Sequence, residues 1–179
     1  MRFEVSENLA IIYTERLILR RYKECDYDSL KEMWLGYMET HKNLQKEDFM
    51  LVDKWIENYS HKEYCWIAED RKSQCFIGNI NVIRMSRKHS NCELGYAVKF
   101  DKRQQGYATE MLKSVIDYLL DEENFHVIEA SHYSGNPNSG KVMKKAGMKK
   151  EAELRERRYN FLTEEYENLI CYCVVSNKL

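Results

Sequence analysis

A strand, a glycine-containing turn and an amphipathic helix follow one another without a break between Glu93 and Leu120, and this stretch constrains the fold most. The strand pattern ends at Val98, and Gly106 stands where the helix pattern begins. Backbone N–H groups in the first turn of a helix lack partners inside the helix and carry partial positive charge, so they bind phosphate. Gly106 lets the main chain approach such a ligand, and the small Ala108 leaves the first turn uncluttered. The sequence therefore predicts a pyrophosphate-sized anion site at this turn.

Hydrophobic periodicity predicts the remaining elements. Strands are expected at Arg16–Arg21, Tyr64–Glu69, Cys75–Arg84, Asn91–Val98, Val127–Ser131, Lys149–Tyr159 and Tyr166–Val175. Helices are expected at Tyr27–Leu35, Gln45–Tyr59 and Tyr107–Leu120, with a fourth that opens at Asn138 or Ser139 and ends at Ala146. The order β-α-α-β-β-β-α-β-α-β-β indicates an α+β (mixed α/β) fold, with a mixed, mostly antiparallel sheet and helices on both faces.

Length and composition narrow the class of protein. The chain has 179 residues, one proline and seven glycines, which predicts one domain over residues 1–179 without a linker. A formal net charge of −1 disfavours a nucleic-acid-coating surface. Six cysteines without zinc-ligand spacing suit a reducing compartment, and no apolar run approaches the ~20 residues of a membrane helix. We therefore expect a cytoplasmic protein with no metal and no partner of nucleic acid or membrane.

Four sequence blocks, in order along the chain, resemble one known family. Arg103-x-x-Gly106-x-Ala108 is similar to the acetyl-CoA signature of the GNAT N-acetyltransferases. The other blocks are Thr14–Arg20, Glu93–Tyr96 and Asn136–Met148, and the set resembles the ribosomal-protein-alanine (RimJ/RimL-like) branch. The resemblance implies a sheet that splays between its fourth and fifth strands, with acetyl-CoA as the cosubstrate in the opening.

The resemblance also implies residues for the cosubstrate. The pantetheine arm would pair with the backbone of Ala97 and Val98. The pyrophosphate would lie against Arg103, Gln104, Gly106, Tyr107, Ala108 and Thr109. Asn136 and Ser139 would lie near the thiol end, and Lys141 and Lys145 would face the outer phosphate.

Acetyl transfer to an amine needs a base for the amine and a proton donor for the leaving thiolate. Glu93 is the candidate base, and the alternative is a structural strand glutamate. Many family members supply a tyrosine as donor where this chain has Met143, so Ser139 is the candidate donor, with a helix cap as its alternative. His132 is expected to be a structural histidine.

The leading hypothesis is an N-acetyltransferase that moves an acetyl group to a primary amine by direct attack. The acceptor is either a protein N-terminus or a small amine. The alternative is a non-catalytic acyl-CoA-binding module of the same fold, suggested by the absence of tyrosine at position 143. Acidic residues between the first two helices either line a pocket for a cationic acceptor or face solvent; they are Glu32, Glu39, Glu47 and Asp48. The sequence leaves open a homodimer and the length of the acyl group.

Overall fold

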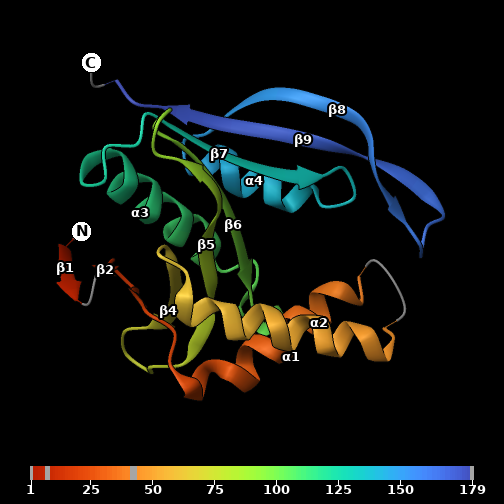
Figure 1. Cartoon of the computed structure of the whole chain (residues 1–179), viewed down its shortest axis with the longest axis horizontal. Helices are drawn as coiled ribbons and strands as arrows, with labels where there is room; N and C mark the ends of the chain where they lie inside the picture. The colour runs from red at the N-terminus through yellow and green to blue at the C-terminus, as the bar shows by residue number, and fades with distance from the viewer. Residues whose placement is uncertain (1, 7–8, 41–43, 178–179) are drawn as a thin grey trace.

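The computed structural model describes residues 2–6, 9–40 and 44–177. Over these residues, nine strands form a sheet in the order β1-β2-β3-β4-β5-β6-β7-β9-β8 (Figure 1). The strands are β1 (Arg2–Ser6), β2 (Leu9–Tyr13), β3 (Leu17–Arg20), β4 (Cys65–Asp70), β5 (Phe76–Ser86), β6 (Asn91–Val98), β7 (Val127–Tyr133), β8 (Lys149–Asn160) and β9 (Glu165–Val175). The helices are α1 (Tyr27–Met38), α2 (Lys46–Glu57), α3 (Tyr107–Asp121) and α4 (Pro137–Lys145), and short 3₁₀ turns are η1 (Glu24–Asp26), η2 (Asn58–His61) and η3 (Phe100–Lys102).

The sheet is mixed and mostly antiparallel, which confirms the predicted fold class. Every neighbouring pair of strands is antiparallel except β6 and β7. The parallel ladder joins Asn91–Leu94 to Val127–Ala130. Beyond that point β6 continues its pairing with β5 and β7 continues with β9, so the two strands diverge (Figure 1). This divergence is the splay that the resemblance implied.

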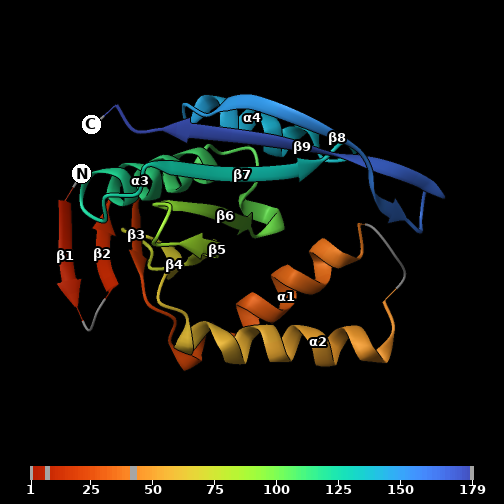
Figure 2. The same cartoon turned by 45° about the horizontal axis from the view of Figure 1, so that its top comes forward.

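Helices cover both faces of the sheet. Apolar residues of α3 and α4 pack in the larger core, together with Leu94 and Val98 of β6. The helices α1 and α2 pack on the opposite face, against Ile67 of β4 and Ala97 of β6. Figure 2 shows α1 and α2 together on one side of β5 and β6, away from α3 and α4. Alternating β6 residues therefore face two different layers.

The ends of several elements differ from the prediction by one to three residues, as at α1, which ends at Met38 and not at Leu35. Two differences have a clear structural reason. The strand at Leu17–Arg20 is the third and not the first, because a β1–β2 hairpin precedes it. Leu9, Ala10 and Ile12 of β2 become buried by joining the core beneath α3, a long-range contact that a five-residue pattern does not reveal. The helix expected to open at Asn138 or Ser139 begins earlier, at Pro137, because the preceding Asn136 caps it.

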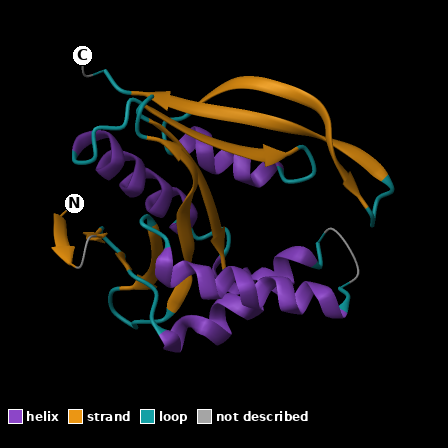
Figure 3. Ribbon diagram, viewed as in Figure 1, coloured by secondary structure: helices purple, strands orange, loops and turns teal. Residues whose placement is uncertain are grey.

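The C-terminal strands form a long hairpin that arches over α4 (Figure 3). Its strands β8 and β9 extend the sheet beyond β7, with β9 in the inner position. No helix among the described residues is long and apolar enough to cross a membrane.

Candidate active site

The turn before α3 has the geometry of an anion cradle. Gly106 is the N-cap of α3 and has φ 85°, a left-handed conformation that favours glycine. Gln104, two residues earlier, is also left-handed, with φ 61°. The first intrahelical hydrogen bond runs from the Glu110 N–H to the Gly106 carbonyl at 3.1 Å. The N–H groups of Tyr107, Ala108 and Thr109 therefore stand ahead of the helical ladder, where they can bind an anion.

A bracket of long-range contacts holds this turn to the start of β3. The Arg16 guanidinium donates from Nε to Glu110 Oε2 at 2.7 Å and from Nη1 to the Gln105 carbonyl at 2.9 Å. It also lies 4.4 Å from the centroid of the Tyr107 ring. Glu110 accepts further bonds from the Thr14 hydroxyl at 2.6 Å and the Arg16 backbone N–H at 2.9 Å. The predicted Thr14–Arg20 block thus contacts the predicted anion site.

The ionisation of Glu110 reflects this bracket. Burial raises the pKa of Glu110, but the hydrogen bonds from Thr14 and from Arg16 outweigh burial and hold that pKa below its ordinary value. Sequence reasoning missed the roles of Arg16 and Glu110. The only available signal was the joint presence of the two blocks, because 94 positions separate these residues.

Arg103 lies at the open end of the splay. Its Nε donates to the Val98 carbonyl at 3.2 Å, and its guanidinium lies 5.1 Å from the centroid of the exposed Phe100 ring. A cavity of about 320 Å³ opens beside it, between α1 and the connection from β6 to α3. The structure therefore brings together three predicted features: the β6 end, Arg103 and the anion cradle.

Glu93 lies on β6 one residue before the parallel ladder ends. Its Oε1 accepts from the Ser131 hydroxyl of β7 at 3.0 Å. Its Oε2 accepts from Arg84 of β5, at 2.9 Å from Nε and 2.6 Å from Nη2. The carboxylate is thus held at the vertex of the splay, on the face that α1 and α2 share.

Ser139 lies across the splay from β6, on the other face. Its Oγ is 2.8 Å from the Tyr96 hydroxyl, which also donates to the Ser139 carbonyl at 3.1 Å. Ser139 is not the cap of α4, because Asn136 accepts the Ser139 N–H at 3.4 Å. Burial raises the pKa of Tyr96 to about 12, so this phenol stays protonated at neutral pH. A role for Tyr96 was not predicted, although strand alternation places the side chains of Tyr96 and Glu93 on opposite faces of the sheet.

Residues 16–149 match the Acetyltransferase (GNAT) domain family. The chain belongs to the GNAT acetyltransferase family. The matched residues include the splay, the cradle and α4, and the match confirms the family predicted from the four sequence blocks.

Relatives and solved structures agree with this assignment. The Bacillus subtilis (strain 168) "Uncharacterized N-acetyltransferase YoaA" is 25% identical over 156 residues, which cover 83% of this chain and 88% of that protein. The ribosomal-protein-S5-alanine acetyltransferase from Vibrio fischeri has a TM-score of 0.73 at 16% identity, covering 94% of this chain and 97% of that one. Spermidine N-acetyltransferase from Vibrio cholerae, in complex with CoA and spermine, has a TM-score of 0.75 at 16% identity. The match covers 92% of this chain and 98% of that one. These two structures establish likeness of fold.

Two further predicted positions of this GNAT domain have packing roles. His132 is buried and stacks on Tyr172 of β9, with ring centroids 5.8 Å apart. A Cβ atom on Gly140 of α4 would lie 2.5 Å from His132 Nε2, so glycine permits close packing of α4 on β7. Met143 is buried in the same core. In the part of the chain that the structure describes, no group of three or more His, Cys, Asp or Glu side chains could hold a metal ion.

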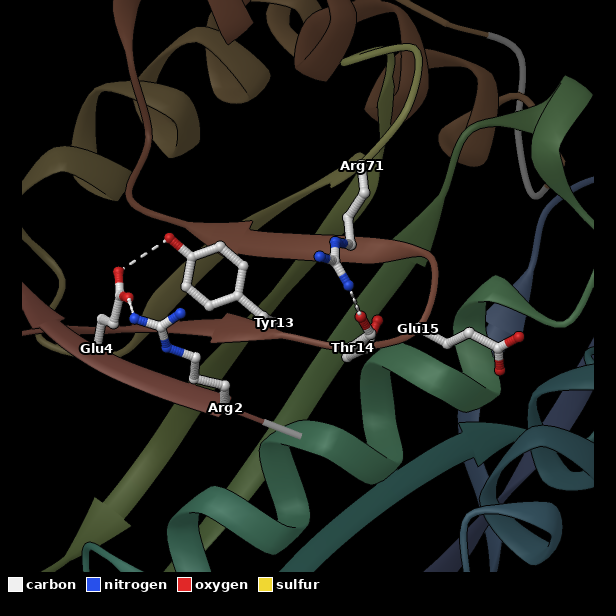
Figure 4. Close-up of a pocket in the computed structure, with 6 residues that line it drawn as sticks. All are labelled: Arg2, Glu4, Tyr13, Thr14, Glu15 and Arg71. Atoms are coloured by element: carbon white, nitrogen blue, oxygen red, sulfur yellow. Dashed lines mark hydrogen bonds and ion pairs between the residues drawn. The ribbon is translucent and has the colours of Figure 1, made fainter.

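A larger cavity, of about 550 Å³, lies away from the splay. It is lined by Arg2, Glu4, Tyr13, Thr14, Glu15 and Arg71 (Figure 4). Several of its side chains are already paired: Tyr13 donates to Glu4 at 3.1 Å, Arg2 forms an ion pair with Glu4, and Arg71 donates to the Thr14 carbonyl at 2.7 Å. It contains neither the candidate base nor the candidate proton donor. The candidate active site is therefore the splay and not the larger cavity.

Proposed function

We propose that this GNAT domain, spanning residues 1–179, transfers an acetyl group from acetyl-CoA to a primary amine by direct attack. The observation that carries the proposal is the arrangement of three features around one opening of the sheet. The cradle before α3 lies at the open end, Glu93 lies at the vertex, and the Tyr96–Ser139 pair spans the opening on the α4 side. Each feature supplies one requirement of acetyl transfer: cosubstrate binding, a base and a proton donor.

Cosubstrate binding is assigned to the residues that the resemblance implied. Backbone groups of Ala97 and Val98 would hold the pantetheine arm, and Asn136 would lie beside it. The pyrophosphate would bind Arg103, Gln104, Gly106, Tyr107, Ala108 and Thr109. The left-handed Gly106 supports this assignment, because its conformation exposes the N–H groups of the first turn of α3.

In the proposed reaction the acceptor nitrogen bonds to the acetyl carbon as the carbon–sulfur bond breaks. The Glu93 carboxylate takes the proton that the nitrogen loses, and Ser131 holds that carboxylate in place through Oε1. The thiolate receives a hydrogen bond from Ser139, whose hydroxyl is in turn bonded to Tyr96. Because burial raises the pKa of Tyr96 to about 12, the pair acts as a hydrogen-bond donor that is present at neutral pH.

The acceptor and the cellular setting complete the proposal. We place the chain in the RimJ/RimL-like branch, with a protein N-terminus or a small amine as acceptor. Structural neighbours that act on each kind of amine support both choices. All six cysteines are free thiols, which supports a reducing cytoplasm. The buried Met143, which cannot donate a proton, favours the alternative of a non-catalytic acyl-CoA-binding module.

A thiol-release assay with acetyl-CoA and a panel of amines tests the proposal. Wild-type protein should release CoA in the presence of at least one amine, and Glu93→Gln should lower kcat by about 10²-fold or more. Glu4→Gln is the control and should keep activity, because the Glu4 carboxylate bonds to Tyr13 and Arg2 in the cavity away from the splay. Stabilisation by acetyl-CoA without turnover of any amine would support the binding module instead. Equal rates for Glu93→Gln and wild type would remove Glu93 from the mechanism.

A further inference from the structure

A β-bulge sets the surroundings of Glu93. Val82 of β5 pairs with Leu94 of β6, but the next pair is Arg84 with Glu93, so Ile83 is the extra residue. Bulges re-aim side chains and are frequent beside active sites. Here the bulge places Arg84 directly opposite Glu93, where cross-strand neighbours project from the same face. Ile83 instead lies over Gly95: a Cβ atom added at Gly95 would lie 2.6 Å from Ile83 Cδ1.

The result is a carboxylate whose two oxygens are both engaged. Ser131 donates to Oε1, and the Arg84 guanidinium donates twice to Oε2. The Glu93 side chain is only 13% exposed, whereas the Arg84 side chain is 80% exposed. The guanidinium therefore covers the solvent side of a recessed carboxylate while its own arm remains in water.

This arrangement has a chemical consequence for a base. An amine that delivers its proton to Glu93 needs an oxygen of that carboxylate, and Arg84 holds Oε2. Because the Arg84 side chain is 80% exposed, its guanidinium returns to water when it leaves Glu93, so an incoming ammonium group can compete for Oε2. Ser131 retains Oε1 throughout, because its hydroxyl comes from β7 and not from the exposed arm.

We propose that Arg84 is an internal cation that covers the base in the free enzyme and is displaced by the acceptor amine. Arg84 thereby sets the apparent affinity for the acceptor and favours acceptors that arrive as cations. This inference rests on the proposed function, since it takes Glu93 as the base. It adds a specificity-determining residue that acts before the chemical step.

Other charged and titratable groups around Glu93 agree with a cation-accepting environment. Glu129 of β7 is the register partner of Glu93, and Cys171 of β9 is the register partner of Ser131. Burial, followed by the charges of Glu93 and Glu129, raises the pKa of the Cys171 thiol. The carboxylates that act on this thiol outnumber the single Arg84 cation that opposes them. When Arg84 swings away, the two carboxylates attract the acceptor more strongly.

Initial-rate kinetics at saturating acetyl-CoA test this inference. Spermidine and an alanine-initiated pentapeptide serve as the varied amines. Arg84→Ala should lower the acceptor KM by about 5-fold, because the amine no longer has to displace the guanidinium, with little change in the KM of acetyl-CoA. Arg84→Lys should fall between wild type and alanine, because lysine keeps the charge but not the two-pronged contact. Arg2→Ala is the control, since it removes another exposed Arg–Glu ion pair, with Glu4, far from the splay.

The outcomes separate this inference from the proposed function. Wild-type turnover together with an unchanged or higher acceptor KM in Arg84→Ala would overturn the inference and leave the function intact. Failure of wild type to acetylate any amine would overturn the function. In that event, calorimetric titration of spermidine into the CoA-bound wild type and Arg84→Ala still decides the inference: tighter binding by the variant supports it, and equal or weaker binding refutes it.

Discussion

Replacing Arg16 with alanine tests how the anion cradle is held in shape. The change removes the bonds to Glu110 and to the Gln105 carbonyl and the contact with the Tyr107 ring. The side chains of Arg16 and Glu110 are 40% and 18% exposed, so we assign about 1 kcal/mol to their charged bond. The carbonyl bond and the cation–π contact contribute about 0.5 kcal/mol each, for a total near 2 kcal/mol. In a domain of this size the melting temperature should fall by about 4–8 °C.

The functional effect should appear in cosubstrate binding. Without the guanidinium, Gln105 loses its anchor to β3, and the turn must be ordered at the expense of binding energy. We expect the KM of acetyl-CoA to rise about 10-fold, with kcat at saturation within about 2-fold of wild type. Thermal melts and the thiol-release assay measure the two effects. Glu110 keeps its bonds from Thr14 and from the backbone of residue 16, so the variant should still fold.

Arg71→Ala is the matched control, because Arg71 donates to the Thr14 carbonyl on the other side of the same segment. It should lower the melting temperature less and leave the KM of acetyl-CoA unchanged. If Arg16→Ala melts and binds acetyl-CoA like wild type, the bracket does not hold the cradle. If Arg71→Ala raises the KM equally, the effect belongs to the whole segment and not to Arg16.

Three further predictions concern stability and the proton donor. Gly140→Ala should lower the free energy of unfolding by about 1–3 kcal/mol, because the alanine Cβ would lie 2.5 Å from His132 Nε2. An unchanged melting temperature would contradict this packing. The pKa of Glu110 is lowered on balance, so its stabilising effect is complete above its ordinary pKa of 4.5 and is lost as pH falls through the folded value. In Glu110→Gln the melting temperature should therefore fall less steeply than in wild type between pH 5 and pH 3. The same slope in both proteins would refute this. Ser139→Ala and Tyr96→Phe should each lower kcat about 10-fold without adding in the double variant, whereas additive losses would show independent roles.

Local patterns predicted the elements around the site closely. The strand predicted at Asn91–Val98 has those bounds in the structure, and the helix predicted at Tyr107–Leu120 ends one residue later, at Asp121. Both follow from side-chain periodicity, which depends on neighbours a few residues apart. The N-terminal hairpin was missed because β2 is short and is buried through contacts with distant core residues.

In the candidate site, too, local features were predicted and long-range contacts were not. The cradle at Gly106 and the candidate base Glu93 were predicted from short motifs, which involve residues close together in the chain. Their partners were not predicted, because the contacts span long intervals: 94 positions for Arg16 and Glu110, and 43 for Tyr96 and Ser139.

The sequence by itself determined the class of fold, the family and the position of the anion cradle, because each depends on residue order and local spacing. Tertiary structure alone decided which groups hold those motifs in place. The extra residue at Ile83 turns Arg84 toward Glu93, a choice set by strand register and not by composition. Asn136 caps α4, which leaves the Ser139 hydroxyl to Tyr96. Such pairings depend on where strands and helices meet, and packing of the whole sheet decides that.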